Sequence, residues 1–82
     1  MHFSEEEIGK IITDKIFALS YKKISSQEET LIESGILSSI TVVELAVELE
    51  KTFLISFSFV EVNKENFNTA GAIRKLIQKK FT

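Results

Sequence analysis

Apolar side chains recur every three or four residues in three segments of this chain, the spacing that places them on one face of an α-helix. The segments cover about residues 5–20, 39–53 and 70–81. The apolar face of residues 5–20 comprises Ile8, Ile11, Ile12, Ile16 and Leu19. That of residues 39–53 comprises Val42, Leu45, Leu49 and Phe53, widened by Val43, Ala46 and Val47. That of residues 70–81 comprises Ala70, Ile73, Leu76 (or Ile77) and Phe81. Faces of this kind are buried against one another. The sequence therefore predicts a small all-α bundle of three main helices, with residues 1–82 forming a single domain.

Residues with capping chemistry stand where these helices are expected to begin. Ser4 and Glu7 match a capping box, in which a serine and the residue three positions later bond each other's backbone N–H. Asn63 is placed to cap a short helical turn, and Thr69 or Asn68 to open the last helix. These signals set the predicted order: helix, long loop, helix, short turn, helix.

The long connection over residues 21–38 is too apolar for a free linker. Its apolar residues are Leu31, Ile32, Ile36 and Leu37, and they predict that the loop packs onto the core. Gly35 stands where a turn needs a positive φ angle. Ser26 to Glu29 is a second capping-box match and predicts a single helical turn.

Residues 54–62 are harder to assign, because Ile55, Phe57 and Phe59 alternate with serines at the period of a β-strand. A lone strand has no partner in a chain with no second run of this kind. The prediction is an extended segment with one side held against the core.

Composition excludes several kinds of catalytic site. The 82-residue chain has no cysteine and one histidine, His2, near the N-terminus. Disulfides, thiolate metal sites and a cysteine nucleophile are therefore excluded, and a serine–histidine–aspartate triad or a multi-histidine metal site is disfavoured. No assembled pair of carboxylates or lysines replaces them, so the sequence predicts a protein that is not an enzyme.

Charge and hydropathy disfavour nucleic acid and membranes as partners. The net charge is -2, whereas a DNA or RNA binder needs clustered positive charge. Basic residues gather only at Arg74, Lys75, Lys79 and Lys80, the expected solvated face of the last helix. No apolar stretch reaches the ~20 residues that span a bilayer. Acidic residues stand where a signal peptide would be basic, so a cytoplasmic location is expected.

Two adjacent serines, Ser38 and Ser39, directly precede the second helix. Backbone N–H groups at a helix start have no partner within the helix, and the helix dipole is positive there. A phosphate attached at this point is electrostatically favoured. Ser38 is the expected N-cap and Ser39 the candidate attachment point, with attachment at Ser38 as the alternative.

With this order of elements, the chain resembles the acyl carrier protein family, which includes peptidyl and D-alanyl carrier proteins. One matching stretch, residues 31–40 (LIESGILSSI), is similar to the family's entry to its second helix, apolar-acidic-x-Gly-apolar-Leu-Asp-Ser-Leu. The other, residues 65–73 (ENFNTAGAI), is similar to the family's Glu-Asn-Phe-x-Thr-x-x-Ala-Ile. The resemblance extends over most of the chain, from Ile8 to about Ile77.

The resemblance implies that Ser39 receives 4′-phosphopantetheine from coenzyme A through a separate phosphopantetheinyl transferase. The thiol of that arm would carry acyl or aminoacyl groups as thioesters, delivered by a loading ligase or synthase. The second helix would dock these partners. The docking residues implied are Ser38, Ile40, Glu44, Glu48 and Glu50. Nothing in the chain demands more than a monomer, and the sequence does not specify the cargo or its pathway, whether fatty acid, polyketide, nonribosomal peptide or D-alanyl.

Three departures from the family pattern favour a dedicated partner or a specialised pathway. Ser38 replaces the usual aspartate, Ile40 replaces leucine, and Lys51 lies on an otherwise acidic docking helix. Serine caps a helix about as well as aspartate, yet it lacks the negative charge that a transferase and its metal would recognise.

Two other functions remain open at this point. A carrier-like domain that has lost modification would serve as a docking or regulatory module. A small helical DNA-binding domain also has three short helices, but the candidate recognition helix here is acidic, which disfavours that reading.

Overall fold

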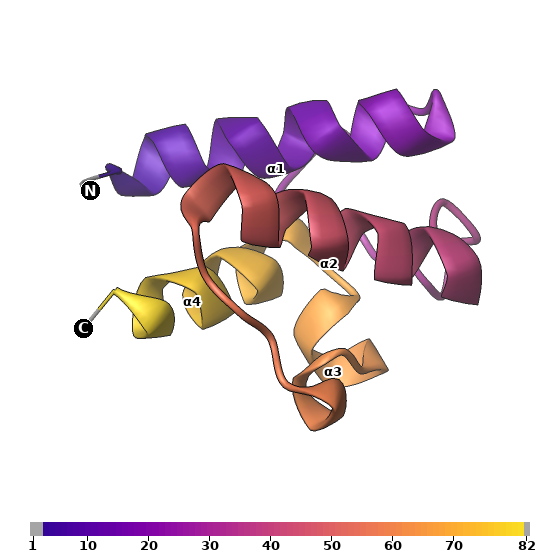
Figure 1. The fold of residues 1–82 in the computed structure, drawn as a ribbon. Helices are drawn as coiled ribbons and strands as arrows, with labels where there is room; N and C mark the ends of the chain where they lie inside the picture. Colours follow the sequence, from indigo (N-terminus) through magenta and orange to yellow (C-terminus); the bar gives the residue numbers. More distant parts are fainter. Residues whose placement is uncertain (1–2, 82) are drawn as a thin grey trace.

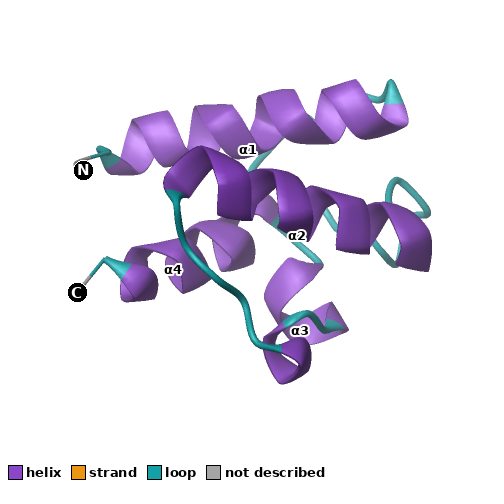
Figure 2. Cartoon of the chain, in the orientation of Figure 1, coloured by secondary structure: helices purple, strands orange, loops and turns teal. Residues whose placement is uncertain are grey.

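The structure is a computed structural model, and it describes residues 3–81, so His2 lies outside the described residues. Within them the chain forms four α-helices and one short 3₁₀ helix (Figures 1 and 2). The helices are α1 (Glu5–Ser20), α2 (Ser39–Phe53), α3 (Lys64–Phe67) and α4 (Ala70–Lys80), and η1 (Phe59–Glu61) precedes α3. The prediction of an all-α bundle with three main helices, a short helical turn and a long first loop is confirmed.

Helix α1 packs against both α2 and α4, and both of these run antiparallel to it (Figure 1). The N- and C-terminal ends of the described chain therefore lie at one end of the bundle, while α2 begins at the other. Helix α3 packs against α4 on the side away from α1. This arrangement places the start of α2 beside the long loop and away from both ends of the chain.

The helices begin at the caps that the sequence predicted. Ser4 and Glu7 form the reciprocal capping box at α1, with bonds of 2.8 and 3.1 Å. Asn63 accepts from the Asn66 N–H at 2.8 Å, and Thr69 caps α4 by accepting from Ala72. Each cap satisfies a backbone donor that the helix itself leaves free.

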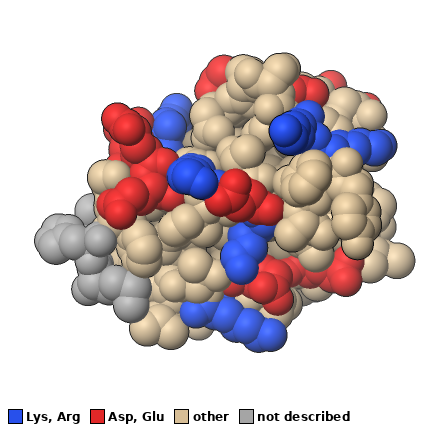
Figure 3. Space-filling view, turned by 90° about the horizontal axis from the view of Figure 1, so that it is seen from above, with Lys and Arg blue, Asp and Glu red and all other residues tan. Residues whose placement is uncertain are grey.

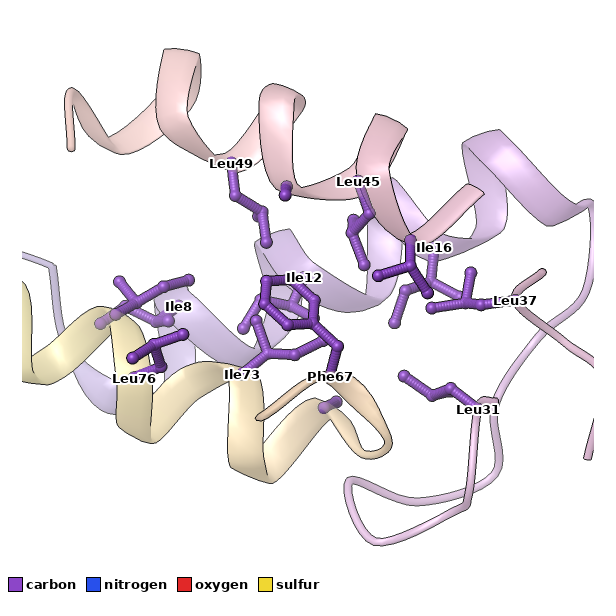
Figure 4. Close-up of a cluster of buried hydrophobic side chains, with 14 of the residues drawn as sticks. Ile8, Ile12, Ile16, Leu31, Leu37, Leu45, Leu49, Phe67, Ile73 and Leu76 are labelled. Carbon is purple, nitrogen blue, oxygen red and sulfur yellow. The ribbon is translucent and has the colours of Figure 1, made fainter. Parts of the chain in front are cut away.

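One core of buried apolar side chains holds the elements together (Figure 4). Helix α1 contributes Ile8, Ile12 and Ile16, while Ile11 and Leu19 are only partly buried. The other helices contribute Val42, Leu45, Ala46, Leu49, Phe53, Phe67, Ala70, Ile73, Leu76 and Ile77. Leu76 and Ile77 are thus both buried. Phe81 remains 38% exposed, although it stacks on Phe3 at 6.2 Å between ring centroids.

Two residues assigned to the apolar face of α2 are not in the core. Val43 is 55% exposed and Val47 is 41% exposed. Helix α2 packs on α1 through the narrower face that holds Leu45 and Leu49, and a contact with one neighbouring helix buries only part of a wide apolar face. The prediction that Val43 and Val47 widen the buried face was therefore wrong.

The long loop packs onto the core as predicted. Leu31 and Leu37 are fully buried, and Ile32 and Ile36 pack against the core edge. Gly35 has φ +83°, a conformation that a side chain would strain. The predicted turn beginning at Ser26 is present as a hydrogen-bonded turn rather than a helix, with Glu29 N donating to Ser26 O at 3.3 Å.

The segment after α2 is extended only at its beginning. Ile55 and Phe57 pack against the core, as the alternating pattern predicted. Phe59 does not follow them: it begins η1 and is 94% exposed. The segment turns away from the core there, because Glu61 accepts from the Ser58 N–H and forms an ion pair with Lys80 at 2.6 Å.

Candidate functional site

The start of α2 presents two serine hydroxyls in different roles. Ser38 is the N-cap: its Oγ accepts from Thr41 N at 3.2 Å, while its own N–H donates to Thr41 Oγ1 at 2.6 Å. Threonine thus takes the part that glutamate or glutamine plays in the usual capping box. Because Ser38 makes these bonds, it is held in place as the cap.

Ser39 is the first residue of the helix proper and is exposed. Among residues 3–81, no acceptor is found for the backbone N–H groups of Ser39 and Ile40. The first turn of α2 contains no acidic residue, so no carboxylate within that turn offsets the positive end of the helix dipole. The residues present therefore fit an attached phosphodiester, which would be accessible to solvent and stabilised by the helix start.

The loop that leads to Ser39 is anchored by Asn68, which joins α3 to α4. Its carbonyl accepts from Leu31 N at 2.6 Å, and its Oδ1 accepts from Ile32 N at 3.0 Å and Glu33 N at 3.3 Å. Its Nδ2 donates to Glu33 at 3.1 Å. These bonds hold the loop against the bundle, and they therefore fix the position at which α2 begins.

A second anchor lies earlier in the same loop. Gly71 N donates to the carbonyl of Gln27 at 2.9 Å, and the Gln27 amide donates to Thr13 at 3.1 Å. The anchoring roles of Asn68 and Gln27 could not be predicted from the sequence. Each pairs with residues far away in the chain, and helical periodicity carries no signal for such pairs.

The predicted docking residues differ in their exposure to solvent and in whether their side chains are paired with other residues. Ile40 is 71% exposed and Glu44 is exposed, and both lie near Ser39 on α2. Glu48 is paired with Lys15 at 3.5 Å and with Lys51 at 4.0 Å. Glu50 turns toward the segment after the helix, where its Oε2 accepts from Phe57 N at 2.7 Å. Glu48 and Glu50, both expected as docking residues, are therefore engaged in contacts within the bundle.

Apolar side chains are also exposed on the surface of α2 that follows Ser39. Ile40, Val43 and Val47 follow one another at helical spacing and are 71%, 55% and 41% exposed.

Acidic and basic side chains are interspersed on the face of the molecule seen in Figure 3. Arg74 and Lys80, from the basic group late in the sequence, form ion pairs with Glu5 and Glu61. This pairing leaves little clustered positive charge for nucleic acid.

Residues 3–81 contain no group of three histidine, cysteine, aspartate or glutamate side chains able to hold a metal ion. Over the same residues, no helix combines the length and apolar character needed to cross a bilayer.

Comparison with known proteins gives the family. The chain is 33% identical over 75 residues to the D-alanyl carrier protein of Streptococcus pyogenes serotype M5 (strain Manfredo), covering 92% of this chain and 89% of that protein. It is 44% identical over 68 residues to the D-alanyl carrier protein of Streptococcus suis (strain 05ZYH33), covering 82% and 86%. No protein-family model matches the chain. With this identity over nearly the whole length of its relatives, the chain belongs to the acyl carrier protein family.

Proposed function

We propose that this carrier protein holds an acyl or aminoacyl group as a thioester on a 4′-phosphopantetheine arm attached to Ser39. The observation that carries the proposal is the exposed Ser39 hydroxyl in the first turn of α2, next to the Ser39 and Ile40 N–H groups, for which no acceptor is found among residues 3–81. D-alanine is the favoured cargo, because the relatives are named D-alanyl carrier proteins.

The attachment reaction uses Ser39 as the nucleophile. Its Oγ loses a proton and forms a phosphodiester with the pantetheinyl phosphate of coenzyme A, releasing adenosine 3′,5′-bisphosphate. A phosphopantetheinyl transferase would supply the catalytic groups, since no nucleophile–base pair accompanies Ser39 within residues 3–81. The bound arm supplies a thiol that a loading ligase or synthase esterifies with the cargo.

Docking of these enzymes would use the surface of α2 that surrounds Ser39. Ser38, Ile40 and Glu44 are exposed there and lie within five residues of Ser39 in the sequence. Glu48 and Glu50 contribute less free charge than the sequence suggested, because Glu48 is shared by two lysines and Glu50 holds the Phe57 amide. The exposed stripe of Ile40, Val43 and Val47 would add apolar contact.

The test is the intact mass of the protein after incubation with coenzyme A and a permissive transferase. We expect the mass of one phosphopantetheinyl group to be added to the wild type and to Ser38→Ala, and nothing to be added to Ser39→Ala. Ser38→Ala is the matched control because it removes the neighbouring hydroxyl and leaves Ser39. An unchanged wild-type mass would instead support the alternative, an unmodified docking or regulatory module.

A further inference from the structure

Ser38 and Ser39 are both exposed to solvent, so burial does not decide which of them a transferase would modify. Attachment to either serine is the same reaction. The attacking Oγ gives up its proton and bonds to the pantetheinyl phosphorus of coenzyme A, and adenosine 3′,5′-bisphosphate leaves. The two hydroxyls are one residue apart, and they differ in their hydrogen bonds.

Every polar group of Ser38 is bonded within the start of α2. Its N–H donates to Thr41 Oγ1 at 2.6 Å, and its carbonyl accepts from Val42 N at 3.0 Å and from Thr41 Oγ1 at 3.1 Å. Its Oγ accepts from Thr41 N at 3.2 Å and also lies 3.1 Å from Thr41 Oγ1. When the single hydroxyl proton of Thr41 is given to the Ser38 carbonyl, the Ser38 hydroxyl is the donor in this last bond. The Thr41 side chain therefore engages the N–H, the carbonyl and the hydroxyl of Ser38.

The residue before Ser38 restricts it further, whereas Ser39 is not restricted in this way. Leu37 is 1% exposed, and its N–H donates to Leu31 O at 2.8 Å. Ser38 is thus held between a buried side chain and the first turn of α2, and its hydroxyl would break its bonds with Thr41 by turning away. Within residues 3–81, no hydrogen-bond partner is found for the hydroxyl or the N–H of Ser39.

We infer that Thr41 directs attachment of the arm to Ser39 by holding the hydroxyl of Ser38 in the helix cap. The inference rests on the proposed function and names a residue that determines where the arm is attached. The bonded Ser38 oxygen is the weaker nucleophile, because it already accepts a hydrogen bond and its own proton must leave another. Attachment at Ser38 would also disturb the cap of α2. Thr41 acts on the reaction through Ser38, which makes it a positioning residue.

The experiment uses two matched substitutions of Thr41. Thr41→Val keeps the shape of the side chain and removes its hydroxyl, whereas Thr41→Ser keeps the hydroxyl and removes the methyl group. Both leave the backbone N–H of position 41 to bond Ser38 Oγ. Each protein is incubated with coenzyme A and the permissive transferase, and fragmentation mass spectrometry measures the ratio of arm on Ser38 to arm on Ser39.

We expect Thr41→Val to raise the ratio of Ser38 to Ser39 attachment about 2- to 12-fold over the wild type, the factor that loss of one ordinary hydrogen bond produces. Thr41→Ser should keep the wild-type ratio. A role in packing alone would give the opposite order, because valine fills the same space as threonine and serine does not. Thr41→Ala removes the same hydroxyl while favouring the helix, so it should raise the ratio with α2 kept folded.

Two results would overturn the inference: a ratio no higher in Thr41→Val and Thr41→Ala than in the wild type, or an equal rise in Thr41→Ser. Failure of the proposed function is seen separately. If the wild type gains no phosphopantetheinyl mass, the proposed function fails and this inference fails with it. If the arm is found on Ser39 and the ratio does not respond to Thr41, only the role of Thr41 is contradicted.

Discussion

The side chain of Asn68 accepts a hydrogen bond from the backbone of Ile32 at 3.0 Å, although the two residues are 36 positions apart. This bond joins the connection between α3 and α4 to the middle of the loop that leads to Ser39. The site at the start of α2 therefore depends on a contact made far from it in the chain.

Asn68→Ala should destabilise the protein and loosen the loop. The substitution leaves the N–H groups of Ile32 and Glu33 without their acceptor, and an unsatisfied polar group costs about 1–3 kcal/mol. We expect a loss of this size in the free energy of unfolding measured with urea. Lys75→Ala, at an exposed position of α4, is the control and should change stability little. Equal stability of the two variants would show that Asn68 does not anchor the loop.

Leu31→Ala tests whether the loop belongs to the core. Leu31 is 0% exposed, and truncating a buried leucine costs about 2–5 kcal/mol. An 82-residue domain has about 4–12 kcal/mol of stability at ordinary values per residue. The variant should therefore lose a large part of its stability in thermal or urea unfolding. Leu54→Ala, at a leucine that is 74% exposed, should lose far less, and a loss equal to that of Leu31→Ala would contradict the packing.

Glu61 predicts a specific pH dependence. The hydrogen bond from Lys80, then that from the Ser58 backbone, hold the pKa of Glu61 below its ordinary value of 4.5. A carboxyl whose pKa is lowered by folding stabilises the folded state above its unfolded pKa. That contribution is lost as the pH falls from about 4.5 through the lower pKa of the folded state.

Glu61→Gln should therefore flatten the decline of unfolding free energy below pH 4.5. The capping residue Glu7 also has a lowered pKa, caused first by the Ser4 backbone hydrogen bond, so part of the decline should remain. Glu65→Gln, in the first turn of α3, serves as the control. A Glu61→Gln profile identical to that of the wild type would contradict the role given to the Lys80 pair.

Ser38→Asp should raise the rate at which a generic transferase modifies the protein. The substitution restores the acidic residue of the family pattern, and aspartate caps a helix about as well as serine. It should also stabilise the protein by about 0.3–1 kcal/mol through the helix dipole. Ser38→Asn is the matched control, because it keeps a capping oxygen without the charge. Equal modification rates for the two variants would show that the transferase does not recognise the charge at position 38.

The helices could be predicted from the sequence because their signals are local. The capping pair of Ser4 and Glu7 lies within one turn, and Ile8, Ile12 and Ile16 repeat at helical spacing. Val43 and Val47 were misplaced because their spacing does not reveal how much of α2 the neighbouring helix covers. Their exposure leaves an apolar groove between α2 and the segment that follows it.

The contacts that shape the site could not be predicted in the same way. Glu50 reaches the Phe57 amide because the chain reverses at Leu54, a non-glycine residue with φ +55° that ends α2. Leucine rarely adopts this conformation, so nothing in the sequence marked the reversal. The position of Ser39, in contrast, followed from its neighbours, since Ser38 and Thr41 cap each other within one turn.

The most direct test of the account is fragmentation mass spectrometry of the peptide that contains Ser38 and Ser39, after treatment with coenzyme A and a transferase. We expect one added phosphopantetheinyl group, carried by the Ser39 side chain. A peptide of unchanged mass, or an added group on Ser38, would contradict it.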